Sequence, residues 1–320
     1  MIRVFPLLLM LLFPVRWELN GLPVAKGKSR FSLFPEPSPI WKEASLRIPF
    51  RFSGNLMLVE LSVDSIRGDF ILDTGAPHLV LNKTYFRSYP RFGEVLASGV
   101  SVAGNVGNQT RIGKLDFGGL EFNAVDADMV PLGHLESTTG TPIYGLIGLN
   151  LLARLELNID FEAGFLEFFP VNRRGDRLVP SAADSADVEL NMTGSNRQLF
   201  IDGSIGGKML RYCLDTGAET NLLHNQLSNK VMQNVQLLKR TSITGSTGKV
   251  SEAILGRIAS MQFGSQVYPG LPAVILDLNP LKAAFQEGFD GVLGMDFLYR
   301  HQKMVINLSQ RKVRLWKRAD

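Results

Sequence analysis

The sequence predicts an all-β protein made of two similar lobes. The segment "FILDTGAPHLVLN" at residues 70–82 has a near copy, "YCLDTGAETNLLH", at residues 212–224, so that Asp73 and Asp215 stand 142 positions apart. Around each copy, apolar and polar residues alternate in short runs separated by glycine or polar turns, which is the pattern of half-buried strands. The same parts follow both copies in the same order, and two units of this kind make a two-lobed β protein.

The chain of 320 residues is long enough for two such units. Hydrophobic residues make up 45% of it and charged residues 20%, so each unit can bury a core of its own. The net charge of +4 arises at the N-terminus, because residues 1–30 hold five of the 34 basic residues and one of the 30 acidic ones. The remainder is balanced and has no basic run interleaved with aromatics, so we do not expect nucleic acid as a partner.

The first 17 residues, "MIRVFPLLLMLLFPVRW", have the pattern of a secretory signal peptide. One early arginine precedes about a dozen apolar residues, which is fewer than the roughly 18 to 20 that a membrane span needs. We therefore expect no stable membrane span, and export to the bacterial periplasm or cell envelope, or secretion. The alternative interpretation of this segment is a buried N-terminal strand.

Cys213 is the only cysteine of the chain, so no internal disulfide can form. An exported protein without disulfides is more typical of bacteria than of eukaryotes. Cys213 follows apolar residues in a predicted buried strand, where we expect a small core residue and not a reactive thiol.

Two breaks in the apolar pattern divide the chain. Residues 18–44 are rich in Pro, Ser and Lys without a period and are typical of a tether. At 171–187 small and charged residues replace the apolar ones and indicate a linker. We therefore expect an N-terminal lobe at 45–170 and a C-terminal lobe at 188–320.

The elements of each lobe are predicted in the same order. A pair of alternating strands leads into Asp-Thr-Gly, and the segments 101–122 and 242–263 then predict long hairpins with glycine-rich tips. An apolar strand follows and ends at Gly148 in one lobe and Gly294 in the other.

A short helix and closing strands complete each lobe. We expect Asn150 and Asp296 to cap the two short helices. A further helix, "NPLKAAFQEG", with Asn279 as its cap, is expected in the second half only. The closing strand at 311–318 is expected to pair with 165–169 across the lobes.

The two aspartates need a partner because apolar strands carry them toward the interior. A turn alone does not explain why apolar residues lead directly into each aspartate and resume soon after it, and an unpaired buried charge is costly. Pseudo-twofold packing brings a residue against its own counterpart, so Asp73 would meet Asp215. Two carboxyl groups within hydrogen-bonding range hold one proton between them.

Such a pair can hydrolyse an amide with water directly. The ionised carboxylate draws a proton from a bound water, while the protonated carboxyl donates to the carbonyl oxygen of the substrate. The chemistry requires no nucleophilic side chain, no metal and no cofactor.

The motifs also carry a family resemblance. Two Asp-Thr-Gly-Ala segments, with "LIGLNLL" at 146–152 and "VLGMDFL" at 292–298 downstream, resemble the aspartic proteases and, more closely, their retropepsin-like branch. The resemblance covers roughly 45–170 and 188–316. It implies the bilobal acid-protease fold as a tandem, single-chain form of the retropepsin dimer, and a monomer that acts on a polypeptide substrate.

The resemblance also implies roles for the motif residues. Asp73 and Asp215 would be the catalytic dyad. Four residues would support them, the threonines by hydrogen bonds across the lobe interface and the glycines by permitting close backbone approach. These residues are Thr74, Gly75, Thr216 and Gly217.

The sequence departs from the family pattern in two respects. Retropepsins usually place an acidic residue after Asp-Thr-Gly-Ala, and Glu219 fits this pattern whereas Pro77 does not, so the two halves would bind substrate differently. Neither hairpin has the tyrosine of the pepsin flap. Their tips instead predict two flaps, at 103–109 and 244–249, that close over an extended peptide by strand addition.

The glycines of the flap tips would give them mobility, although ordinary hairpin glycines need no such role. They are Gly104, Gly107, Gly245 and Gly248.

The sequence thus predicts an exported aspartic endopeptidase. Two alternatives stay open. One is a peptide-binding or scaffolding protein on the same fold with a silent dyad. The other is a maturation protease of narrow specificity that acts on one partner or on its own residues 18–44.

Overall fold

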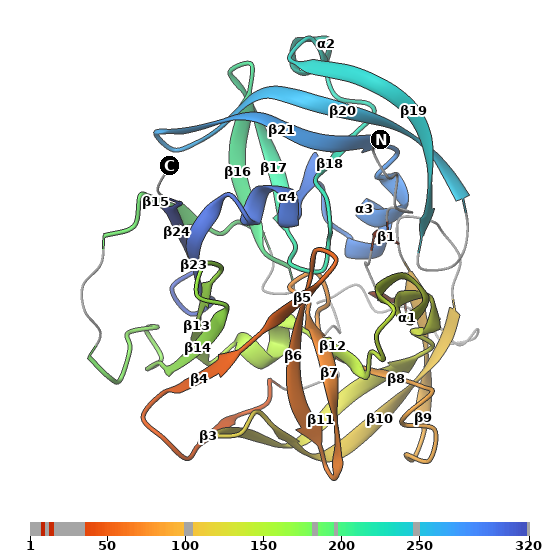
Figure 1. Cartoon of the computed structure of the whole chain (residues 1–320), viewed down its shortest axis with the longest axis vertical. Coiled ribbons are helices and arrows are strands. Elements are labelled where there is room, and N and C mark those ends of the chain that lie inside the picture. The colour runs from red at the N-terminus through yellow and green to blue at the C-terminus, as the bar shows by residue number, and fades with distance from the viewer. Residues whose placement is uncertain are drawn as a thin grey trace, which may run out of the picture.

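The computed structural model describes residues 8–9, 13–15, 36–98, 105–180, 185–194, 198–245 and 250–318. The chain forms two β lobes, with the N-terminal lobe in the lower half of Figure 1 and the C-terminal lobe in the upper half. A third sheet, at the left of this view, joins strands of both lobes. Within the described ranges, no helix is both long and apolar enough to cross a membrane.

The N-terminal lobe is built on a ten-stranded sheet. Strand β7 (Ile66–Leu72) runs parallel to β12 (Gly145–Ile147), which is in turn antiparallel to β8 (Leu79–Asn82). Every residue of β8 and β12 is buried, as expected for central strands that are covered on both faces. The other strands of the sheet are β2 (Phe13–Val15), β3 (Pro39–Trp41), β5 (Arg51–Ser53), β6 (Leu56–Val63), β9 (Phe92–Ser98), β10 (Asn105–Asp116) and β11 (Leu120–Val130).

The C-terminal lobe repeats this arrangement in an eight-stranded sheet. Strand β17 (Lys208–Leu214) runs parallel to β22 (Gly291–Leu293), and β22 is antiparallel to β18 (Leu222–His224). The two lobes therefore place equivalent strands around each Asp-Thr-Gly. The other strands are β1 (Leu8–Leu9), β16 (Phe200–Ile205), β19 (Val235–Gly245), β20 (Val250–Phe263) and β21 (Gln266–Leu276).

A six-stranded sheet ties the lobes together. Its order is β15 (Val188–Asn191), β24 (Lys312–Lys317), β23 (His301–Asn307), β13 (Leu155–Asp160), β14 (Phe165–Pro170) and β4 (Leu46–Pro49). The lobes meet where β13 pairs with β23, as in the pair of Leu157 and Ile306. The expected pairing of 311–318 with 165–169 is therefore wrong, because β23 and β13 lie between these two strands.

The apolar core crosses the boundary of the lobes. The largest cluster of buried side chains includes Phe70 of the first lobe, Tyr212 of the second, and Leu157 and Ile306 of the shared sheet. Cys213 is fully buried in a second cluster within the C-terminal lobe, which confirms it as a core residue. Burial of apolar area in one continuous core is the main force that holds the lobes together.

The short helices differ from the expectation in two ways. Helix α1 (Gly133–Thr139) lies in the first lobe and α3 (Asn279–Phe285) in the second, each between a long strand and the central apolar strand. The expectation that only the second half has this helix is therefore wrong. Figure 1 shows both helices at the right of the molecule, one in each lobe. Leu278, and not Asn279, is the N-cap of α3.

The expected side-chain caps of the other short helices are also wrong. Helix η1 (Leu149–Leu152) begins after Gly148, and α4 (Met295–Leu298) begins after Gly294, both with extended backbone at the glycine. Asn150 and Asp296 lie too far into their helices to cap them. The remaining helix of the described ranges is α2 (Asn229–Met232).

Long hairpins are present in both lobes, but their arms are placed differently from the prediction. The arms are β9 with β10 and β19 with β20. Gly107 lies inside β10 opposite Val95, and Gly245 is the last residue of β19. Gly104 and Gly248 lie outside the described residues, so the flap glycines stay a prediction.

Each of these hairpins pairs with one short N-terminal strand. Strand β1 pairs in parallel with the end of β19, with Leu8 opposite Thr244, and β2 pairs antiparallel with β9, with Phe13 opposite Ser98. Residues 8–9 thus lie along one arm of the C-terminal hairpin, and residues 13–15 lie along one arm of the N-terminal hairpin. That residues 1–17 act as a secretory signal stays a prediction.

Candidate active site

Each Asp-Thr-Gly begins where two parallel strands end. The backbone N–H of Asp73 donates to Ile147 O at 3.1 Å, and that of Asp215 donates to Leu293 O at 3.0 Å. The adjacent apolar strand therefore fixes the point at which each aspartate leaves the sheet. The two loops are built alike because the same strands hold them.

One carboxylate oxygen of each aspartate is held by its own loop. Asp73 Oδ1 accepts hydrogen bonds from the N–H groups of Gly75 and Ala76 at 2.9 and 3.0 Å. Asp215 Oδ1 accepts one from the N–H of Gly217 at 2.8 Å. The other oxygen, Oδ2, of both residues accepts no hydrogen bond from an N–H or hydroxyl group of the described residues, and the two carboxyl groups lie within hydrogen-bonding range of each other.

The two carboxyl groups face each other across the lobe interface. A Cβ atom added to Gly75 would lie 2.5 Å from Asp215 Oδ2, and one added to Gly217 would lie 2.6 Å from Asp73 Cγ. The backbone of each loop therefore packs against the carboxyl group of the opposite lobe. Only glycine fits there, because any side chain would collide with that carboxyl group.

Thr74 and Thr216 lock the two loops together. Each backbone N–H donates to the hydroxyl oxygen of the other threonine at 3.0 Å. The Thr74 hydroxyl donates to Leu214 O at 2.9 Å, and the Thr216 hydroxyl donates to Leu72 O at 2.7 Å. These four buried bonds fix the relative position of the aspartates.

Burial and proximity make the carboxyl groups hard to ionise together. Both aspartates have no exposed surface. Burial raises the pKa of Asp73 to about 6, against the lowering effect of hydrogen bonds with Ala76, with the Asp215 carboxyl group and with Gly75. Burial, and then the charge of Asp73, raise the pKa of Asp215 well above its ordinary value. The pair therefore holds one proton over a range that extends above the ordinary pKa of an aspartate.

The position after each motif differs between the lobes, as the sequence indicates. The helix starts are alike, since Leu149 N–H donates to Ala76 O at 2.8 Å and Met295 N–H donates to Ala218 O at 2.8 Å. Glu219 is half-buried, and burial, followed by the charge of Asp296, raises its pKa to about 7. Pro77 offers no charge at the corresponding place.

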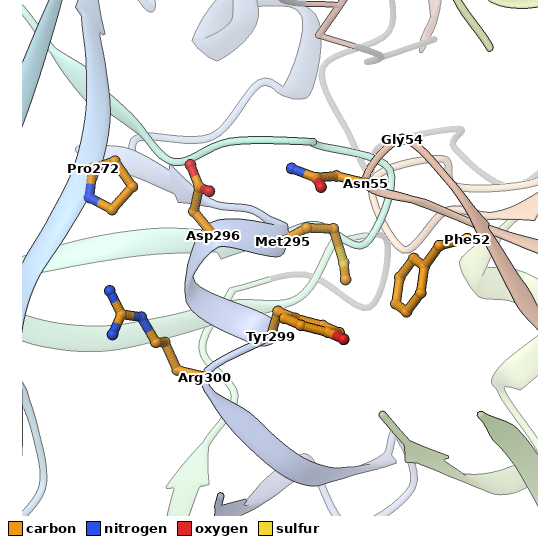
Figure 2. A pocket seen from close by; sticks show the side chains of 8 residues that line it. All are labelled: Phe52, Gly54, Asn55, Pro272, Met295, Asp296, Tyr299 and Arg300. Atoms are coloured by element: carbon orange, nitrogen blue, oxygen red, sulfur yellow. The ribbon is translucent and has the colours of Figure 1, made fainter. Parts of the chain in front are cut away.

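A pocket of about 450 Å³ lies where the turn between β5 and β6 meets α4, and the dyad is not among its lining residues. Figure 2 shows Asn55 of this turn pointing toward Asp296 and Met295, with Phe52 and Tyr299 on the opposite side. The rings of Phe52 and Tyr299 meet edge to face at 5.4 Å. The turn also contacts the loop of the second motif, because Asn55 Nδ2 donates to Glu219 O at 3.2 Å.

The structure thus brings the two aspartates together with their threonines and motif glycines. Neither this pocket nor the buried Asp128 of β11 was predicted from the sequence. In the described ranges, no cluster of three or more His, Cys, Asp or Glu side chains is arranged to hold a metal ion.

Comparison with known proteins agrees with this geometry. The pattern of a family described as aspartyl protease matches residues 59–151 and 201–297. No curated protein matches the sequence. Among solved structures, the aspartic proteinase from Irpex lacteus is similar in fold, with a TM-score of 0.53 and 14% identity over 86% of this chain and 98% of that chain. Because the family pattern matches twice and covers more than half of the sequence, the chain belongs to the aspartyl protease family, in a tandem, single-chain form with the bilobal acid-protease fold.

Proposed function

We propose that the protein is an aspartic endopeptidase whose dyad is Asp73 and Asp215. The observation that carries this proposal is that each motif glycine packs against the carboxyl group of the opposite lobe. A Cβ atom added to either glycine would lie only 2.5 to 2.6 Å from that carboxyl group. Two carboxyl groups in this position can hold a water between them and share one proton.

In the proposed reaction, the dyad acts first on the water and then on the leaving amine. The ionised carboxylate takes a proton from the water while the water oxygen bonds to the carbonyl carbon of the substrate. The protonated carboxyl gives its proton to the carbonyl oxygen. The resulting gem-diol loses a hydroxyl proton to the carboxylate that is now ionised. The other carboxyl, which took its proton from the water, gives that proton to the amide nitrogen, and the carbon–nitrogen bond breaks. The pair ends with the single proton with which it began.

The Oδ2 atoms suit this role. In each aspartate Oδ1 is occupied by backbone N–H groups, so Oδ2 is the oxygen left to bind water or substrate. The threonine bonds hold both carboxyl groups in place before substrate binds, which is the preorganisation that acid–base catalysis requires.

An extended substrate fits the proposal, because the hairpins accept added strands. Strands β1 and β2 pair with β19 and β9 through backbone hydrogen bonds, which do not depend on side-chain identity. A polypeptide substrate would use the same strand addition under the two hairpins.

Cleavage of a mixture of synthetic peptides, read by mass spectrometry, tests this proposal. We expect the wild type to cut peptide bonds and the Asp73→Asn and Asp215→Asn variants to lose at least about a thousandfold in kcat. Asp69→Asn, which removes only an exposed ion pair with Arg51, is the matched control and should keep full activity. A wild type that binds peptides without cutting them would instead support the non-catalytic alternative.

A further inference from the structure

Position 128 breaks the symmetry of the two lobes. Strand β11 runs parallel to β8 with Asp128 opposite Val80, and β21 runs parallel to β18 with Val274 opposite Leu222. Val80 and Leu222 occupy the same place in the two copies of the motif. Asp128 is therefore the counterpart of Val274, so the first lobe has a carboxyl group where the second has an apolar side chain.

Asp128 faces the side of β11 that lies next to the dyad loop. The neighbouring residues Ala127 and Met129 belong to the large core, whereas Val130 belongs to a separate apolar cluster. Because side chains alternate along a strand, Asp128 shares the face of Val130.

The cluster on this face reaches the dyad. It contains Val80, the partner of Asp128, and Ala76 of the first motif. The N–H of Ala76 donates to Asp73 Oδ1 at 3.0 Å. Asp128 therefore lies on the dyad side of its sheet, beside β10 of the N-terminal hairpin.

The Asp128 carboxyl group is buried and only partly bonded. Only 4% of the residue is exposed, and its side-chain hydrogen bond comes from Gln109 of β10. Oδ1 has no partner within the described residues. Burial raises the pKa of Asp128 to about 7, which the bond from Gln109 only partly offsets.

The next acid on the same face shows what Asp128 lacks. Asp126 is also buried, but Arg111 binds both of its oxygens, at 2.6 and 2.9 Å. Asp126 and Arg111 thus satisfy each other, and Arg111 is not left to pair with Asp128. A buried carboxyl group with an unbonded oxygen is unfavourable unless a partner completes it.

We propose that Asp128, with Gln109, is a specificity-determining subsite of the first lobe that binds a lysine or arginine side chain of the polypeptide substrate. A cation supplies the hydrogen-bond donors that the unbonded oxygen needs and neutralises the carboxylate. The corresponding place in the second lobe, at Val274, selects an apolar side chain. The inference rests on the proposed function, because it assumes that a polypeptide lies between the hairpins and the dyad.

Profiling the full-length protein with a set of synthetic peptides tests the proposal. The peptides differ at one position at a time, with Lys, Arg, Leu, Gln or Glu. For the wild type we expect one subsite at which Lys and Arg give a kcat/KM at least about tenfold above Leu. The preference should act mainly on KM and should grow as the pH rises through about 7, where the carboxyl group ionises.

Two variants and a control identify the residue responsible. Asp128→Asn should remove the preference for Lys and Arg, and Asp128→Leu should reverse it in favour of Leu, while kcat for apolar peptides stays within about twofold. Glu121→Gln, in the same strand but paired with Lys42 and Lys114, should leave the preference unchanged. Thermal unfolding of each variant shows that it is folded.

Three results would overturn the proposal. The preference could be absent in the wild type, it could persist in folded Asp128→Asn, or both Asp128 variants could lose kcat equally for every peptide, which is the sign of a structural role. If the wild type cuts nothing, binding of the same peptides to the Asp215→Asn variant separates the two proposals. Binding that favours Lys and Arg and depends on Asp128 would support the subsite proposal even though the endopeptidase proposal fails. Binding that does not depend on Asp128 would reject the subsite proposal.

Discussion

At the scale of single residues, the pairing of Asp73 and Asp215 depends on positions that carry no acidic group. The glycines and threonines of the motifs bring two buried acids face to face and hold them there. The motif sequence was sufficient to predict this arrangement, because two copies of Asp-Thr-Gly at equivalent points of a repeat leave few other packings. Asp128 could not be predicted, since an aspartate in "VDADMV" looks like the solvent-facing residue of an alternating strand.

Gly75→Ala tests the close packing of the loops. Its Cβ would lie 2.5 Å from Asp215 Oδ2, so the loop or the carboxyl group must move. We expect peptide cleavage to fall at least about a hundredfold and the free energy of unfolding, measured with urea, to fall by about 1–3 kcal/mol.

Gly133→Ala is the matched control for this substitution. No atom lies within 4 Å of its added Cβ, and the residue is in α1, so stability should stay unchanged or rise by up to about 1 kcal/mol. Equal effects of the two substitutions would contradict the packing described here.

Asp128→Asn should change how stability depends on pH. The pKa of Asp128 is raised in the folded state, so the folded protein holds a proton that the unfolded chain releases above about pH 4. The wild type should therefore lose stability from this group as the pH rises from about 4 to about 7.

The Asp128→Asn variant should not show this loss of stability, because its side chain does not ionise. It should equal the wild type near pH 4 and exceed it above pH 7 by an amount on the order of a few kcal/mol, measured by urea unfolding across this range. A variant that is less stable than the wild type at pH 8 would show that the carboxylate is favourably paired.

At the scale of elements, the lobes use equivalent strands and helices, and the sequence predicted their order but not all of their ends. Helix α1 was missed because "GHLESTT" lacks a helical apolar period, and only Leu135 of it is buried. Extended backbone at Gly148 and Gly294 begins the short helices, so Asn150 and Asp296 do not cap them. Asp296 instead accepts a hydrogen bond from the Thr220 hydroxyl at 2.5 Å.

The hairpin edges give a prediction about the N-terminal segment. Strands β1 and β2 pair with β19 and β9, and one side of a strand can pair with only one other strand at a time. A substrate that adds to the same edges must displace them. A chain that lacks residues 1–17 should therefore show a lower KM for peptides at unchanged kcat in steady-state assays, and an unchanged KM would place the substrate elsewhere.

At the scale of the whole molecule, the lobes form one body. The shared sheet, the continuous core and the threonine bonds all cross their boundary. The two-lobed form was predictable from the repeat, but the strands that join the lobes were not. Local sequence does not specify which strand pairs across a boundary, because that choice depends on how the completed lobes pack.

Thr216→Val tests the lobe interface. The substitution keeps the shape of the side chain but removes the hydroxyl that bonds Thr74 N–H and Leu72 O. We expect the free energy of unfolding to fall by about 1–3 kcal/mol, because a buried donor loses its partner. Thr216→Ser keeps the hydroxyl and should lose less. Equal losses in urea unfolding for the two variants would show that the methyl group, and not the hydrogen bonds, matters.

The pH profile of peptide cleavage tests the central claim most directly. If Asp73 and Asp215 share one proton, kcat/KM should follow a bell-shaped curve whose alkaline limb lies above about pH 6, since burial and mutual repulsion raise the pKa values of the pair. Both limbs should vanish with the activity in the Asp215→Asn variant. A variant that cleaves the same peptide with an unchanged profile would contradict the claim that the two carboxyl groups act as a pair.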